Sequence, residues 1–133
     1  MRLPRAIPML LLLASPTRVP AQVPQEPPAQ EPVFDPYRAE KAIEIGQYYF
    51  KKGNYDAAID RFQEAARYKP NFARPYLLMG KAYEKKGEKA EAVKAYRRYL
   101  EILPSAEDAG KVRERIAKLS REIARAAARR RSG

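Results

Sequence analysis

The chain has 133 residues, enough for one domain with short additional segments. It contains no Cys, His or Trp, which excludes disulfides, thiol nucleophiles, imidazole bases and Cys/His metal sites. Its 27 Lys and Arg against 16 Asp and Glu give a net charge of +11, and a basic surface favours acidic partners. We therefore predict a protein that is not an enzyme, with no catalytic, cofactor-binding or metal-ligating residues and no cofactor.

Residues 1–21 have the pattern of an export signal. Arg2 and Arg5 precede a short apolar run at residues 6–14, and small residues precede a cleavage point after Ala21. The run is much shorter than the roughly 20 residues that cross a bilayer. We expect an exported protein, periplasmic or secreted, without a transmembrane segment in its mature chain. The alternative is an apolar N-terminal segment that is not a signal.

Residues 22–36 hold five of the twelve prolines and three acidic residues, with no base. Such a segment favours extended backbone and cannot form a core. We predict a disordered Pro-rich linker, with a ligand for a proline-reading domain as the alternative. The linker ends at Asp35, which can cap a helix, and Pro36, which suits its first turn.

The chain then repeats itself with a period of 34 residues. The positions that recur are Gly46 as Gly80, Tyr49 as Tyr83, Lys51-Lys52-Gly53 as Lys85-Lys86-Gly87, Ala58 as Ala92 and Pro70 as Pro104. A fixed period of this size indicates a stacked repeat array.

Apolar spacing and end signals predict four helices, at residues 37–52, 55–69, 73–86 and 89–103, closed by Gly53, Pro70, Gly87 and Pro104. The expected inward positions are Ala42, Ile45, Gly46, Tyr49, Ala58, Ile59, Phe62, Ala65 and Ala66 in the first pair. In the second pair they are Tyr76, Met79, Gly80, Tyr83, Ala92, Val93, Tyr96, Tyr99, Leu100 and Leu103. Glycines and alanines facing large aromatic residues predict closely packed helix hairpins.

This pattern resembles the tetratricopeptide repeat: Gly and Tyr in the first helix, Ala and an aromatic residue in the second, and a terminal Pro. The resemblance implies an all-α fold, with antiparallel helix–turn–helix pairs stacked as a short right-handed solenoid over residues 37–70 and 71–104. It also implies a scaffold that binds proteins. Some family members bind chaperone carboxylates through a Lys/Asn clamp, but the corresponding residues here are Ile43, Gln47 and Leu78. The layout is similar to periplasmic repeat proteins of the bacterial envelope, although this chain lacks the lipid-anchoring Cys of the lipoprotein members.

Residues 105–128 leave the repeat pattern. Residues 105–108 read as a helix start with acidic residues in the first turn. Val112, Ile116, Leu119 and Ile123 then form a single apolar stripe, which suits a helix that caps the array. The basic tail, residues 129–133, extends a group of arginines that could contact an anionic partner: Arg125, Arg129, Arg130 and Arg131. Because no aromatic residue alternates with them, nucleic acid is not favoured. The alternative is a solvated helix end.

The resemblance places a concave groove along the first helix of each pair. The predicted peptide-binding residues are Ile43, Gln47, Phe50, Lys51, Arg74, Leu77, Lys81, Glu84, Lys85, Lys111, Arg115 and Lys118. This mixture of basic and apolar side chains suits a peptide with acidic and apolar residues. We expect the best anchors to be Ile43, Phe50 and Leu77, as exposed apolar residues on a concave face. An ordinary polar surface is the alternative.

Three functions therefore remain open. The first is an exported adaptor that binds a protein or peptide in this groove. The second is a binder of anionic lipid or nucleic acid through the C-terminal arginines. The third is a self-associating structural module, such as a homodimer, because two repeats are fewer than the three that usually make a stable array.

Overall fold

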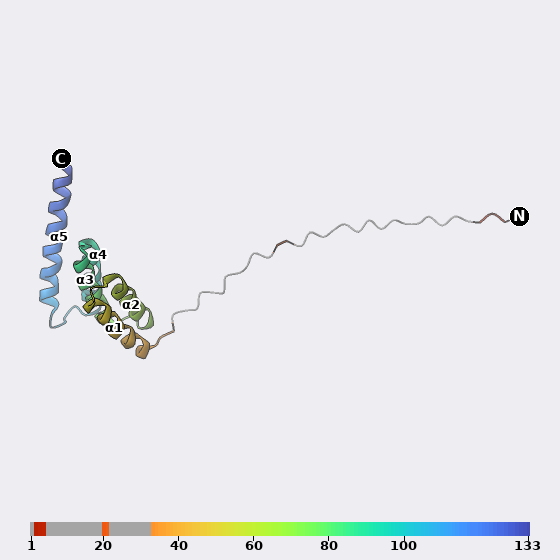
Figure 1. Cartoon of the computed structure of the whole chain (residues 1–133), viewed down its shortest axis with the longest axis horizontal. Helices are drawn as coiled ribbons and strands as arrows, with labels where there is room; N and C mark the ends of the chain where they lie inside the picture. Colours follow the sequence, from red (N-terminus) through yellow and green to blue (C-terminus); the bar gives the residue numbers. More distant parts are fainter. Residues whose placement is uncertain (1, 5–19, 22–32) are drawn as a thin grey trace. The chain divides into compact units, whose positions relative to one another are not determined.

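A computed structural model describes residues 2–4, 20–21 and 33–133 of the chain. Most of the predicted export signal and residues 22–32 of the predicted linker lie outside these residues. The described part is all-α, with α1 (Pro36–Lys51), α2 (Tyr55–Tyr68), α3 (Ala73–Lys86), α4 (Lys89–Ile102) and α5 (Ala109–Arg131). Each helix packs against the next in chain order (Figure 1). This confirms the predicted all-α array of helix pairs.

The ends of the helices follow from capping side chains and glycines. Asp35 Oδ1 accepts a hydrogen bond of 2.9 Å from the backbone N–H three residues later, and Asn54 Oδ1 accepts the equivalent bond at 3.2 Å. Gly53 and Gly87 have φ angles of 76° and 79°, the left-handed conformation in which helices commonly end.

Each helix pair packs a glycine against a buried aromatic ring. A methyl group added at Gly46 would lie 2.5 Å from Phe62 Cε1, and one added at Gly80 would lie 2.5 Å from Tyr96 Cδ1. Both rings are buried, with 0% and 1% of their surface exposed. The predicted packing of small against large residues is therefore confirmed at both pairs, since any side chain at the glycines would push the helices apart.

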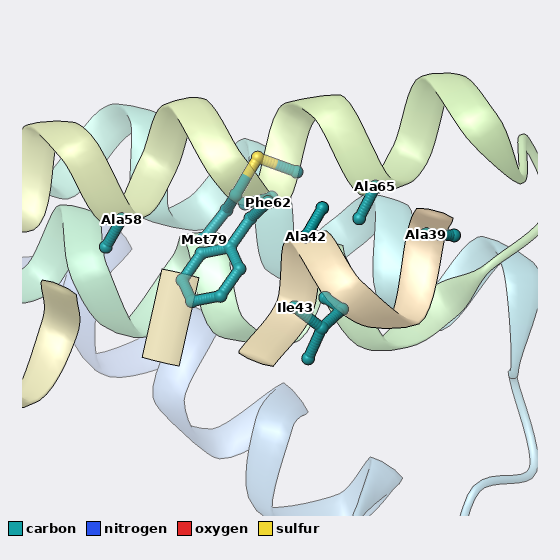
Figure 2. Close-up of a cluster of buried hydrophobic side chains, with 8 residues drawn as sticks. Ala39, Ala42, Ile43, Ala58, Phe62, Ala65 and Met79 are labelled. Atoms are coloured by element: carbon teal, nitrogen blue, oxygen red, sulfur yellow. The ribbon is translucent and has the colours of Figure 1, made fainter. Parts of the chain in front are cut away.

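Two hydrophobic clusters form the core. The first joins residues of α1 to α4: Ala39, Ala42, Ile43, Ala58, Phe62, Ala65, Met79 and Ala95 (Figure 2). The second joins residues of α3, α4 and α5: Ala73, Ala92, Val93, Tyr96, Tyr99, Val112 and Leu119. Tyr76 and Tyr83 of α3 pack against both clusters. The core is therefore continuous from the first repeat to α5.

Two residues predicted to point inward are instead exposed. Ile45 is 37% exposed and Leu103 is 46% exposed. The buried stripe of α1 runs along Ala39, Ala42 and Ile43, which leaves Ile45 on the other side of the helix. Leu103 follows the last residue of α4, where the chain leaves the helix.

The last helix begins and ends later than predicted. Residues 105–108 lie in turns, and the side chain of Asp108 accepts a hydrogen bond of 2.6 Å from the Tyr99 hydroxyl instead of capping α5. The helix continues to Arg131, so most of the predicted tail is helical. Its apolar stripe packs against the second cluster and covers the α4 side of the array. None of the helices in the described residues has the length and apolarity of a membrane span.

Candidate functional site

The predicted binding residues lie on α1 and α3, the first helices of the two pairs, and on α5. Ion pairs connect these three helices: Arg74 Nη1 lies 3.4 Å from Glu40 Oε2 of α1, and Arg115 of α5 pairs with Glu84 of α3. We call the exposed side of these helices the first-helix surface. It contains Gln47, Phe50, Lys51, Arg74, Leu77, Lys81, Glu84, Lys85, Lys111, Arg115 and Lys118.

Ile43 does not belong to this surface. Its side chain is 1% exposed and lies in the first core cluster together with Met79, so the prediction that it is an exposed anchor is wrong. The reason is the position of α3, which contributes Met79 and half-buried Leu78 to the same cluster. An apolar residue that faces the following helix pair is buried by it, and the spacing of residues within α1 does not reveal this.

Glu84 connects three helices through hydrogen bonds. Its Oε1 accepts one of 2.6 Å from the Tyr96 hydroxyl of α4 and one from Arg115 Nε of α5. Burial and then the Glu84 carboxylate raise the pKa of Tyr96 above its ordinary value, which keeps the phenol neutral and able to donate. The hydrogen bond to Glu84 likewise raises the pKa of Arg115. Two predicted groove residues therefore hold α5 on the array.

A polar hollow of about 570 Å³ brings together four of the predicted residues. It is lined by Glu84, Lys89, Lys111, Glu114, Arg115, Lys118, Leu119 and Glu122. Lys89 Nζ lies 3.0 Å from Glu122 Oε2, and the hydrogen bond from Lys89 lowers the pKa of Glu122. Lys111 and Lys118 have no ion-pair partner within residues 33–133. The lining thus contains basic side chains without ion pairs beside the carboxylates of Glu84, Glu114 and Glu122.

Three more lysines extend this positive charge along α1 and α3. Lys51, Lys81 and Lys85 are exposed, and the described part of the chain gives none of them an ion pair. The two remaining predicted anchors are only half-buried. The ring of Phe50 contacts that of Tyr55 edge to face at 5.3 Å, and Leu77 packs against the second cluster. The first-helix surface thus combines free cations with partly exposed apolar side chains.

The C-terminal arginines do not form a single patch. All four lie exposed on α5, where Arg125 and Arg129 are four residues apart and share a side. The helical spacing turns Arg130 and Arg131 to other sides of the helix. The four arginines are therefore distributed around the helix, and their contact with an anionic partner stays a prediction.

The structure also contains an apolar hollow that the sequence did not predict. It has a volume of about 440 Å³ and lies between α2 and α4, over α3. Tyr76, Met79 and Tyr83 line it together with Ala66 and Ala95. Sequence spacing marks Tyr76, Met79, Tyr83 and Ala66 only as inward residues, and the hollow depends on how far apart α2 and α4 lie.

The stacked helix pairs define a helical repeat scaffold. Comparisons with protein families agree with this architecture. Residues 46–87 match the family described as TPR repeat, and residues 73–105 match the family described as Tetratricopeptide repeat. Residues 46–105 therefore form about two tetratricopeptide repeats.

Curated relatives match over the same part of the chain. Hsp70-Hsp90 organizing protein 3 of Arabidopsis thaliana is 35% identical over 72 residues, 54% of this chain and 13% of that protein. Small glutamine-rich tetratricopeptide repeat-containing protein 2 of Mycosarcoma maydis is 38% identical over 55 residues, 41% of this chain and 16% of that protein.

A third relative is an enzyme by its name. A probable UDP-N-acetylglucosamine–peptide N-acetylglucosaminyltransferase of Arabidopsis thaliana is 36% identical over 62 residues, 47% of this chain but 6% of that protein. The chain thus spans only a small fraction of the relatives it matches. Tetratricopeptide repeats are typically scaffolds without catalytic activity, and these matches support a protein–protein interaction adaptor.

Proposed function

We propose that this protein is an exported, non-enzymatic adaptor that binds a peptide with acidic and apolar residues along its first-helix surface. The observation that carries the proposal is a set of five exposed lysines without ion pairs in residues 33–133. They are Lys51, Lys81, Lys85, Lys111 and Lys118.

These lysines differ from the cations that already form ion pairs within residues 33–133. Lys41, Arg61, Lys94 and Arg98 each pair with a carboxylate three residues later or earlier on their own helix. Such pairs already satisfy those cations locally, whereas the free lysines have charge available for a partner. Carboxylates of a bound peptide would form ion pairs with these lysines. The apolar surface of Leu77 and Phe50 would contact apolar side chains of the same peptide.

Fluorescence anisotropy with labelled peptides tests the proposal. The probe is a peptide of alternating Leu and Glu pairs, and two matched peptides carry Lys in place of Glu or Ser in place of Leu. We expect Lys81→Glu to weaken binding of the Leu/Glu peptide by about tenfold. Arg97→Glu is the control, because Arg97 is exposed on α4, has no ion pair in the described residues, and undergoes the same change of charge.

Equal affinity for the Glu and Lys peptides would contradict the proposal. An equal loss of affinity for the Leu/Glu peptide in Lys81→Glu and Arg97→Glu would also contradict it. Deletion of residues 125–133 separates the alternative function. If anionic vesicles bind the full chain and not the deleted chain, while the Leu/Glu peptide binds neither, the arginines of α5 are the functional surface.

Export is tested independently in bacterial cells. Mass spectrometry of the protein from the periplasm should give a chain that begins at Gln22, because the apolar run and Ala21 match a signal and its cleavage point. A full-length chain that stays in the cytoplasm would refute export and leave the binding proposal standing.

A further inference from the structure

Exposed apolar side chains gather at one end of the array. The described residues contain seven large hydrophobic side chains that are exposed, and five of them lie between residues 33 and 48: Val33, Phe34, Tyr37, Ile45 and Tyr48. Tyr37, Ile45 and Tyr48 are 78%, 37% and 57% exposed. Their spacing of eight and then three residues places them on one side of α1, away from the buried stripe.

The same positions of the second repeat show what this side of a helix pair does. At an offset of 34 residues, Lys41, Ile45 and Tyr48 correspond to Pro75, Met79 and Ala82. In α3 all three positions are buried, with Met79 at 6% and Ala82 at 0%. This face of the second repeat therefore packs against the first repeat, while the equivalent face of the first repeat is uncovered within the described residues.

We call this uncovered surface the end face. It includes Tyr48 and a shallow hollow of about 120 Å³ lined by Arg38, Lys41, Ala42, Ile45, Arg61, Glu64 and Tyr68. The face has the shape of a surface on which another helix pair stacks. It is also the kind of surface that repeat arrays normally cover with a terminal cap.

The charges that line the hollow of the end face are paired, unlike the five lysines of the first-helix surface. Arg38 pairs with Asp35 at 3.3 Å, Lys41 with Glu44 at 2.9 Å, and Arg61 with Glu64 at 2.6 Å. Such exposed pairs are weak and can exchange partners with an identical set of pairs. A strongly acidic partner gains little here, whereas a second copy of the same face brings both signs of charge and its own apolar residues.

The geometry points to a symmetric dimer in which the end faces of two copies pack on each other. In a two-fold arrangement, Tyr48 and Ile45 of each copy become buried, and the charged pairs of one end face lie against those of the other. The opposite end of the array is covered by α5, whose outer side is charged. Because the described residues leave only this end open, association would stop at two copies and would not continue into a filament.

Sedimentation equilibrium of the full chain tests this dimer. Over two orders of magnitude in protein concentration, we expect the mass of the wild type to rise from one copy to two and to stop there. Ile45→Glu and Tyr48→Glu should each raise the dissociation constant by about tenfold or more, because a carboxylate is placed in an apolar contact. The matched control is Leu103→Glu, since Leu103 is equally large, 46% exposed and outside the end face.

Circular dichroism should show unchanged helix content in all variants, because each altered side chain is exposed in the monomer. A wild type that stays monomeric throughout would overturn the proposal. So would dimers that Ile45→Glu and Tyr48→Glu leave intact, or masses that grow beyond two copies. Lys81→Glu should leave the dimer unchanged, so failure of the dimer and failure of peptide binding are distinguishable.

Discussion

Gly80→Ala tests the closest contact between paired helices. The new methyl group would lie within 3 Å of three ring atoms of Tyr96. That ring cannot easily move, because it is 1% exposed and its hydroxyl is hydrogen-bonded to Glu84 at 2.6 Å. Overpacking costs about 1 to 3 kcal/mol, and this site belongs at the upper end of that range.

Alanine also has a higher helix propensity than glycine, which offsets up to about 1 kcal/mol of this loss in the free energy of unfolding. We therefore expect Gly80→Ala to lower the free energy of unfolding by about 2 kcal/mol. For a domain of this size, the melting temperature should fall by about 8–16 °C. Urea denaturation followed by circular dichroism measures the loss directly.

Gly110→Ala is the matched control. Gly110 also lies in a helix, but a methyl group there would meet nothing within 4 Å. This variant should be as stable as the wild type or more stable, by less than about 1 kcal/mol. If Gly80→Ala unfolds at the same urea concentration as Gly110→Ala, the close approach of α3 and α4 does not limit stability and the packing argument is wrong.

Three further changes test the core, a helix cap and a buried hydroxyl. Phe62→Ala should destabilise the protein by about 3 to 5 kcal/mol in urea denaturation, because it empties the centre of the first cluster; a loss below about 1 kcal/mol would contradict that role. Asp35→Ala should cost about 1 kcal/mol by removing the cap of α1, whereas Asp35→Asn should retain most of that stability. Burial and the hydrogen bond to Asp108 raise the pKa of Tyr99 to about 12 from its ordinary value of 10.0. Between pH 10 and 12 the folded protein therefore binds more protons than the unfolded chain. The contribution of Tyr99 to the free energy of unfolding is complete below about pH 10 and is lost as the pH rises toward 12. Tyr99→Phe should reduce the dependence of the urea midpoint on pH over that interval, and an unchanged dependence would refute the assignment.

The positions that repeat at 34 residues were sufficient to predict the helix pairs. Gly46 and Phe62 pack as expected because residue size and helical spacing are local properties, and close approach of two helices requires a small residue opposite a large one. Asp35 caps its helix as expected for the same reason, since a cap involves only residues three positions apart.

The candidate site could be predicted only in part. Lys81 and Lys85 are exposed as expected, but Ile43 is buried because α3 lies over it. The pairing of Glu84 with Arg115 also depends on contact between α3 and α5, which are far apart in the sequence. The start of α5 was missed because Tyr99 binds the carboxylate of Asp108, an interaction that no local pattern indicates.

The sequence by itself determined that the chain is a short array of helix pairs, because periodicity and residue size govern how neighbouring segments fold. Only the tertiary structure decided which apolar residues remain exposed. Ile45 and Met79 occupy equivalent positions of the repeat, yet Ile45 is 37% exposed and Met79 is 6% exposed. The physical reason is that burial depends on a neighbour: the first helix pair covers Met79, whereas within the described residues no preceding helix pair covers Ile45.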